Sequence, residues 1–364
     1  MSLGAAPIAT RATEAGVELE IQVRVPGRVV LVEADGTLYL GRNYGIHRSD
    51  DGGRSFVRVA SMPTDGARRL AGASRLLSRL ARLEVRALVR ARDGGLVASN
   101  RQGVFVARPG ERDMRTARVE TGSIPLFPPM RLSRGPGGEI VWGEYGSPKV
   151  PRPIRLFVSR DDGESFQRVH TLEKVLHVHN VVWDAGQGHY WVLTGDHDPE
   201  PGIGRLSADL AHFDWLVKGK QIYRAVEVFD LGDRLLYATD SHLEQNGLIS
   251  LDKASGRSEW LREFDGSCIY ACRFGGLYAL TTSVEPSPVN QSPFAELWLS
   301  RDAETWKCAY RARKDRWSAV WLQFGSLVLP SGASDRELIA FSGQAVEGLD
   351  GSTLIARLAP GAAL

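Results

Sequence analysis

The sequence predicts an all-β fold, a seven-bladed β-propeller with one short helical insertion, and six blades are the alternative. Three observations predict it. An octapeptide of the form S-x-D-x-G-x-S-F occurs at 49–56 and again at 159–166. The distances between this motif and two weaker copies fit a repeat the length of one propeller blade. Most of the chain also divides into segments that share one order of strands and turns.

Composition and charge are those of a folded, nearly neutral chain. The 364 residues are 43% hydrophobic and 24% charged, with 39 glycines, which predicts a large buried core and excludes disorder. We expect one domain over residues 1–364, because a single β architecture of many strands can absorb this length. The 45 basic and 43 acidic residues nearly cancel, so we expect neither a nucleic-acid nor a membrane partner.

The cysteines and the N-terminus indicate a reduced, unexported chain. Cys268, Cys272 and Cys308 include no C-x-x-C pair, so we expect buried thiols and neither disulfides nor structural zinc. No run of eighteen apolar residues occurs, and residues 1–6 lack a charged segment leading into an apolar one. The cytoplasm is therefore the default expectation, unless a signal has been removed. The sequence does not predict an oligomeric state.

Two weaker copies of the motif set the period of the repeat. Ser207 to Asp209 is followed by Trp215, and Ser300 to Asp302 by Trp306. The four copies begin at 49, 159, 207 and 300, so they are 110, 48 and 93 residues apart. A spacing of 48 suits one blade and 93 suits two, whereas 110 suits two blades and an insertion.

Each motif has the composition of a turn between two strands. Its aspartate can accept hydrogen bonds from turn amides, its glycine gives backbone freedom, and its aromatic residue packs into the core. One such loop offers too few carboxylates for calcium. The octapeptides resemble the Asp-box of the bacterial neuraminidase repeat, which implies a sialidase-like β-propeller. The Tyr/Phe-Arg-Ile-Pro motif of sialidases is absent, and the nearest string, at 152–155, reads Arg-Pro-Ile-Arg.

The insertion is predicted to be a helix over residues 66–83. Its leucines and Ala73 recur every three to four residues, and five arginines fill most of the remaining positions. We expect its leucine face to pack on the propeller. The alternative is a basic amphipathic helix that lies on a membrane or binds an acidic partner.

The positions of the motif divide the chain into seven segments that share the same order of strands and turns. Each holds an inner strand, a second strand, a polar loop, a third strand, the motif or its equivalent, and an outer strand. An additional strand at 17–23 alternates apolar and polar residues, so it could pair beside the last segment and close the ring. The segments are about 28–62, 84–120, 128–172, 176–220, 223–264, 267–312 and 317–358.

Ionisable residues gather where first strands begin and second strands end. In a propeller these positions share the axial face, where ligands bind. The candidate catalytic residues are Glu144, His177, His179, Asp196, Asp240 and Glu285. The candidate substrate-binding residues are Arg42, Arg131, Arg224, Tyr145 and Trp317.

These residue types fit an acidic saccharide. Paired carboxylates can supply the acid and the base or nucleophile of glycosidic hydrolysis. Arginines from three segments can clamp a sugar carboxylate, and Tyr145 and Trp317 can stack on a sugar ring. The pair His177 and His179 lies two residues apart on one strand, so both can face one way and, with Asp196, hold a divalent metal. The null alternative is that one histidine hydrogen-bonds a neighbouring blade while the other touches substrate.

Three functions remain open from the sequence. The favoured one is a carbohydrate-active protein that cleaves an acidic saccharide at the axial face, by hydrolysis or by β-elimination. The second is a saccharide-binding or scaffolding propeller without catalysis, since a fold does not determine a function. The third is a metal-dependent lactonase or esterase. No cofactor is certain, and the only one suggested is the divalent metal.

Overall fold

The computed structural model describes residues 2–4, 6–12, 17–82, 84–147, 152–362 and 364, and most of them form β-strands. They divide into two compact units. Unit 1 comprises Met1–Glu84 and Phe264–Leu364, and unit 2 comprises Val85–Glu263. None of the helices in these described ranges is long and apolar enough to span a membrane. The expectation of a single domain stays a prediction.

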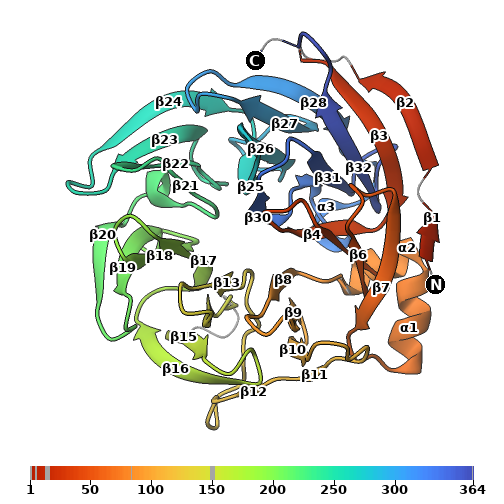
Figure 1. The fold of residues 1–364 in the computed structure, drawn as a ribbon. Helices are drawn as coiled ribbons and strands as arrows, with labels where there is room; N and C mark the ends of the chain where they lie inside the picture. Colours follow the sequence, from red (N-terminus) through yellow and green to blue (C-terminus); the bar gives the residue numbers. More distant parts are fainter. Residues whose placement is uncertain (1, 5, 13–16, 83, 148–151, 363) are drawn as a thin grey trace. The chain divides into compact units, whose positions relative to one another are not determined.

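Unit 2 consists of four sheets that follow one another along the chain (Figure 1). In each sheet four successive strands pair antiparallel in chain order, so the first and the fourth lie at opposite edges of this four-stranded set. The first sheet contains β8 (Ala87–Arg90), β9 (Leu96–Asn100), β10 (Gly103–Ala107) and β11 (Arg115–Thr116). The second contains β13 (Ser133–Arg134), β14 (Ile140–Gly143), β15 (Ile154–Ser159) and β16 (Ser165–Leu172), with β12 (Arg118–Val119) added in parallel to β16. The third contains β17 (His177–Asp184), β18 (His189–Gly195), β19 (Gly202–Ser207) and β20 (Phe213–Lys218). The fourth contains β21 (Phe229–Asp230), β22 (Arg234–Ala238), β23 (Asn246–Asp252) and β24 (Ser258–Phe264).

Unit 1 contains three further four-stranded sheets, which additional bridges connect. The first contains β4 (Arg28–Val32), β5 (Leu38–Arg42), β6 (Gly45–Ser49) and β7 (Ser55–Ser61), with β1 (Ser2–Gly4) added at its edge. The second contains β25 (Ser267–Phe274), β26 (Leu277–Val284), β27 (Phe294–Ser300) and β28 (Lys307–Arg313). The third contains β29 (Gly325–Val328), β31 (Ile339–Gln344), β32 (Ser352–Leu358) and β3 (Leu19–Pro26), with β2 (Ala6–Ala12) beyond it. The strand β30 (Ser331–Ser334) pairs in parallel with both β25 and β4.

The extra N-terminal strand pairs where the sequence predicts it. β3 lies antiparallel to β32, with Ile21 opposite Ala356, and so supplies the fourth strand of the last sheet in unit 1. Its inward residues, among them Leu19 and Val25, are fully buried. The sheets of the two units fall in the predicted segments, and a count of seven blades in one ring stays a prediction. The three cysteines are buried and free, as expected.

Aspartate turns connect the third and fourth strands of four sheets. In the first, Oδ1 of Asp51 accepts from Oγ of Ser49 at 2.8 Å and from N of Ser55 at 3.0 Å. Asp161 accepts the same two bonds, at 2.8 and 2.9 Å. Asp209 and Asp302 accept from the preceding serine and from one or more turn amides. The predicted hydrogen bonds of the aspartate are therefore confirmed at all four positions.

The helical insertion differs from the prediction in two ways. It forms two short helices, α1 (Gly66–Ala73) and α2 (Arg75–Ala81), because Ser74 is extended and its side chain caps α2. Its leucine face does not pack on the sheets: Leu76 and Leu80 are 45% and 52% exposed. Arg79 is instead the buried residue, paired with Asp315 and Asp350 at 2.5 and 3.5 Å. Ion pairing outweighs the apolar periodicity here, since a guanidinium with two carboxylate partners can be buried.

Asp161→Ala should lower the free energy of unfolding by about 1–2 kcal/mol, because it removes three hydrogen bonds to one carboxylate. Urea unfolding measures the change. The matched control is Asp214→Ala, which removes an ion pair to Arg205 in which the aspartate is 61% exposed, so it should change stability by less than about 1 kcal/mol. Equal effects from both variants would contradict a structural role for the turn.

Arg79→Met should release the insertion, because it leaves the carboxylates of Asp315 and Asp350 without their buried partner. We expect a loss of about 2–4 kcal/mol of local stability. Hydrogen exchange of the amides at 66–82 measures it. Arg69→Met, at an exposed position of α1, is the control and should leave the exchange unchanged.

Candidate functional site

Three successive sheets of unit 2 bring six of the predicted site residues together. Each lies at or next to the end of a strand or short helix, at the entry of the first strand or the exit of the second. Because the strands are antiparallel, these ends meet at one edge of each sheet, and His177 pairs directly with Gly195, the residue before Asp196. We call this group the unit 2 cluster: Tyr145, His177, His179, Asp196, Arg224 and Asp240.

The guanidinium of Arg224 connects the cluster. It follows the 3₁₀ helix η1 (Gln221–Tyr223) and is buried. Its Nη2 pairs with Asp196 and, at 3.4 Å, with Oδ2 of Asp240. Its Nη1 donates to Nδ1 of His242 at 2.9 Å and to the backbone oxygen of Asp196 at 3.3 Å. One cation is thus held between two carboxylates.

Backbone carbonyls fix the tautomers of both predicted histidines. Nε2 of His177 donates to O of Gly146 at 3.1 Å, and Nδ1 of His179 donates to O of Ala225 at 2.9 Å. In the neutral rings the lone pairs therefore lie on Nδ1 of His177 and Nε2 of His179. Gly195 makes room for the second ring, since a Cβ there would lie 2.5 Å from Cε1 of His179.

Burial keeps the histidines neutral and the aspartate ionised. Burial lowers the pKa of His177 to about 4, although Asp196 opposes the shift. Burial and the nearby Arg224 charge also lower the pKa of His179. Burial alone would raise the pKa of Asp196, but the Arg224 guanidinium holds it below its usual range.

Two hydrogen-bond acceptors face each other in the cluster. Nδ1 of neutral His177 lies 3.4 Å from Oδ2 of Asp196. It is buried and makes no hydrogen bond to the described residues. A buried acceptor of this kind costs free energy unless a donor reaches it. These two acceptors are therefore suited to hydrogen bonds donated by ligand hydroxyls.

The ring of Tyr145 is largely covered. It stacks on His177 with ring centroids 3.9 Å apart and an angle of 5°. The guanidinium of Arg86 lies 5.0 Å from the centroid of the same ring. Burial raises the pKa of Tyr145 to about 12, so the phenol is protonated at neutral pH. A protonated phenol can donate to a ligand, whereas the His177 stack leaves little room for a sugar on that face.

The metal site expected from His177, His179 and Asp196 does not form among the described residues. No group of three His, Cys, Asp or Glu side chains within those ranges is placed to hold a metal ion. The physical reason is local. The Arg224 cation is paired with the carboxylate that would have been the third ligand.

Arg131 belongs to a second group of contacts on the inner strands of unit 2. Its Nε donates to Oε1 of Glu227 at 2.7 Å, and Asn180 donates to Oε2 at 2.8 Å. Burial raises the pKa of Glu227, although Arg131 opposes the shift. The residues come from three successive sheets, which this group joins.

Glu144 is enclosed by arginines. Arg155 donates to it from N, Nε and Nη2 at 2.7–3.1 Å, and Arg152 donates from both terminal nitrogens at 2.8 Å. The side chain is fully buried, and these arginines hold the pKa below its usual range against the effect of burial. This saturated carboxylate is suited to connecting strands and not to proton transfer.

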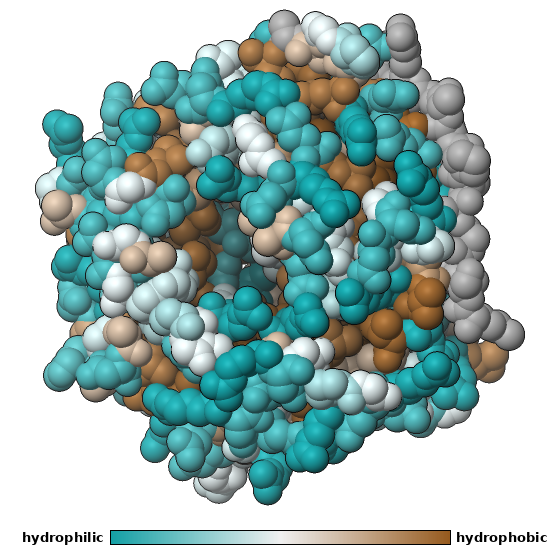
Figure 2. Space-filling view, viewed as in Figure 1, coloured by the Kyte–Doolittle hydropathy of each residue, from teal (hydrophilic) through white to brown (hydrophobic). Residues whose placement is uncertain are grey.

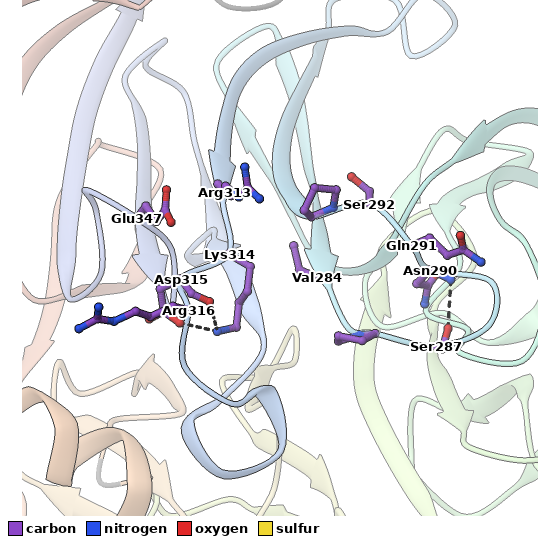
Figure 3. A pocket seen from close by; sticks show the side chains of 12 residues that line it. Val284, Ser287, Asn290, Gln291, Ser292, Arg313, Lys314, Asp315, Arg316 and Glu347 are labelled. Atoms are coloured by element: carbon purple, nitrogen blue, oxygen red, sulfur yellow. Dashed lines mark hydrogen bonds and ion pairs between the residues drawn. The ribbon is translucent and has the colours of Figure 1, made fainter.

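The remaining predicted residues, Arg42, Glu285 and Trp317, belong to unit 1. Glu285 accepts from Oγ of Ser267 at 3.2 Å, and Trp317 is 45% exposed. Val284, the residue before Glu285, lines a cavity of about 690 Å³. Arg313, Lys314 and Arg316 line one side of this cavity, and Asn290, Gln291 and Ser292 line the other (Figure 3). Nζ of Lys314 donates to O of Trp317 at 2.8 Å.

Sequence reasoning missed several residues of the two contact groups in unit 2. Arg86 precedes β8 and Glu227 precedes β21, which are first-strand entries like that of Arg131. The same positional rule therefore could have identified both. Asn180 lies within β17, and its contact with Glu227 has no signal in the sequence.

Comparisons with known proteins relate the chain to others by fold. No protein-family model matches it, and no curated protein is similar in sequence. An oligogalacturonate lyase in complex with manganese superposes with a TM-score of 0.62 at 10% identity, over 99% of this chain and 98% of that chain. YCF48 bound to D1 peptide gives a TM-score of 0.57 at 12% identity over all of both chains. The extracellular domain of BT4673 from B. thetaiotaomicron gives 0.55 at 10% identity, over 90% of this chain and only 40% of that one.

These likenesses, together with the sheets of both units, show that the fold is an all-β propeller. At such low identity they show nothing more than the fold.

Stability should fall as the pH drops from about 6.5 toward 4. An unfolded histidine titrates near 6.5, whereas folded His177 has a pKa of about 4. Between these values the unfolded chain binds more protons, which costs up to about 1.4 kcal/mol per pH unit for each such histidine. Urea unfolding at pH 7 and pH 5 should show a smaller fall for His177→Asn than for the exposed control His212→Asn. Equal falls would contradict a buried, neutral His177.

Proposed function

We propose that this protein is carbohydrate-active and recognises an acidic saccharide at the unit 2 cluster. The observation that carries the proposal is the facing pair of acceptors, Nδ1 of His177 and the carboxylate of Asp196, 3.4 Å apart. Saccharides present closely spaced hydroxyl donors, and two neighbouring hydroxyls could donate one hydrogen bond to each of these acceptors. Nε2 of His179 adds a third acceptor for a neighbouring hydroxyl.

Cations at the cluster support an acidic ligand. Arg224 is buried between Asp196 and Asp240, and Arg86 lies over the ring of Tyr145. A ligand carboxylate could exchange with one of the aspartates at Arg224 or approach Arg86, with charge-assisted hydrogen bonds as the gain. The neutral histidines add no positive charge at pH 7, so the arginines supply the positive charge at the cluster.

Hydrolysis receives less support than elimination. Glycosidic hydrolysis needs a carboxylic acid that keeps its proton, whereas Asp196 and Glu144 both have lowered pKa values. Elimination needs a base for the proton next to the sugar carboxylate, and a cation that stabilises the resulting charge. Nε2 of His179 would take that proton, and a carbon–carbon double bond would form as the bond from the β-carbon to the glycosidic oxygen breaks. The glycosidic oxygen would leave with the bonding electron pair and take a proton from solvent. The likeness to an oligogalacturonate lyase supports this reaction class.

Binding without catalysis is the second candidate. A base works best with a pKa near the operating pH, and burial lowers the pKa values of both histidines. A site of this kind can bind hydroxyls well and still transfer protons poorly. The metal-dependent lactonase is not proposed, because the described residues do not assemble its metal site.

We also propose kinship with Asp-box propellers. Four turns in equivalent places share a serine, an aspartate and the hydrogen bonds between them. This pattern supports common descent of the repeat and carries no information about substrate.

The test is binding and turnover of oligogalacturonate, with a neutral oligosaccharide of the same length as the comparison. We expect the wild type to bind the acidic ligand at least tenfold more tightly, and His179→Ala and Asp196→Asn to weaken that binding roughly tenfold each through lost hydrogen bonds. Calorimetry measures affinity, and the ultraviolet absorbance of an unsaturated product measures elimination. His212→Ala is the matched control and should behave as the wild type.

The outcomes separate the candidates. Product formation that His179→Ala abolishes supports elimination, whereas binding without product supports the binding protein. Equal affinity for acidic and neutral ligands, or unchanged affinity in both cluster variants, contradicts the proposal.

A further inference from the structure

Three short helices in unit 1 expose apolar side chains. They are the insertion helices α1 and α2 and the single turn α3 (Ala319–Leu322). Leu70, Val320 and Trp321 are 75%, 72% and 69% exposed, which is more than the side chains of a groove can be. Most of the face shown in Figure 2 is hydrophilic, with hydrophobic residues in small groups between. We call the following set the insert patch: Leu70, Leu76, Leu77, Leu80, Val320 and Trp321.

Partly buried ion pairs hold the leucines outward. Arg75 pairs with Asp350 at 2.7 Å, and Arg79 pairs with Asp315 at 2.5 Å. These arginines are four residues apart and therefore share one face of α2. Rotating α2 to bury Leu76 and Leu80 would expose this face and separate the pairs. The ion pairs therefore fix the orientation of α2 and, with it, the exposure of its leucines.

Arg79 also joins α2 to α3. Nε of Arg79 donates to O of Leu322 at 2.9 Å, at the end of α3. Ser318 caps the start of α3 by accepting from N of Trp321 at 3.5 Å. Val320 and Trp321 are thus fixed beside α2, and the apolar side chains of both segments form one surface.

The charge of the surface is positive. Residues 66–82 contain five arginines and no acidic residue. Arg75 and Arg79 are paired with the partly buried carboxylates of Asp350 and Asp315, and Arg68 is paired with Asp65 at 3.2 Å. Arg69 is exposed on α1 beside Leu70. Beyond α2, Arg316 is exposed and lies over the ring of Trp317 at 5.1 Å.

We propose that the insert patch docks on a lipid surface with anionic headgroups. Protruding leucines and a tryptophan match the apolar boundary of such a surface, and the flanking arginines match its charge. A protruding patch suits a planar partner better than a peptide, which needs a groove. This attachment would be peripheral, and it revises the expectation that overall charge balance excludes a membrane partner. It does not depend on the proposed saccharide site.

The test is sedimentation of the full chain with vesicles. We expect it to bind vesicles of phosphatidylcholine with phosphatidylserine, to bind pure phosphatidylcholine more weakly, and to lose affinity as salt screens the arginines. Leu76→Ser combined with Leu80→Ser, and Trp321→Ser alone, should each lower the partition coefficient about tenfold or more. Arg69→Gln should weaken binding to the anionic vesicles only.

Matched controls are Leu261→Ser and Trp260→Ser, which change exposed apolar residues on β24 of unit 2. Both should bind vesicles as the wild type does, and thermal unfolding should show every variant to be folded. No binding of the wild type to anionic vesicles overturns the proposal, as does an equal loss in the controls. Self-association that the patch variants abolish, without vesicle binding, would overturn it in favour of an interface between two copies of this chain.

Discussion

Antiparallel pairing within each four-stranded sheet is the constraint on which the rest of the structure depends. It places the entry of the first strand and the exit of the second at one edge, and the turn between the third and fourth strands at the other. Aspartate turns such as that of Asp161 occupy the second position, and their carboxylates are used by the turn itself. Side chains at the first-strand entry and the second-strand exit are not needed to stabilise that turn. His177 and Asp196 can therefore meet there.

At that edge, electrostatics decides which chemistry is accessible. Burial would raise the pKa of an isolated carboxyl and lower that of an isolated imidazole. Arg224 reverses the first effect for Asp196 and adds to the second for His179. The same guanidinium therefore keeps an anion and a neutral base side by side. A site of this composition accepts hydroxyl hydrogens readily, and it lacks the protonated acid that glycosidic hydrolysis needs.

The sequence predicts those features that depend on local spacing. The aspartate turns, the β3 strand and the convergence of His177 with Asp196 follow from strand period and repeat phase. Features that depend on which side chains meet across strands do not follow. Glu144 occupies the predicted kind of position, yet the arginines that saturate it, Arg152 and Arg155, come from the next strand and its preceding loop. The position of a residue along a strand predicts where its side chain lies, but it does not predict which charged groups will pair with it.

The insertion shows the same limit for a helix. Apolar periodicity predicts which residues share a face, and it does so correctly for Leu76 and Leu80. Whether that face turns inward depends on what the neighbouring surface offers. Here it offers Asp315 and Asp350, which are far from α2 in the sequence, and they bind the arginine face. Turning the leucines inward would separate these carboxylates from Arg75 and Arg79, which opposes the gain from burying the leucines. The apolar face is then outward as a consequence of charge pairing.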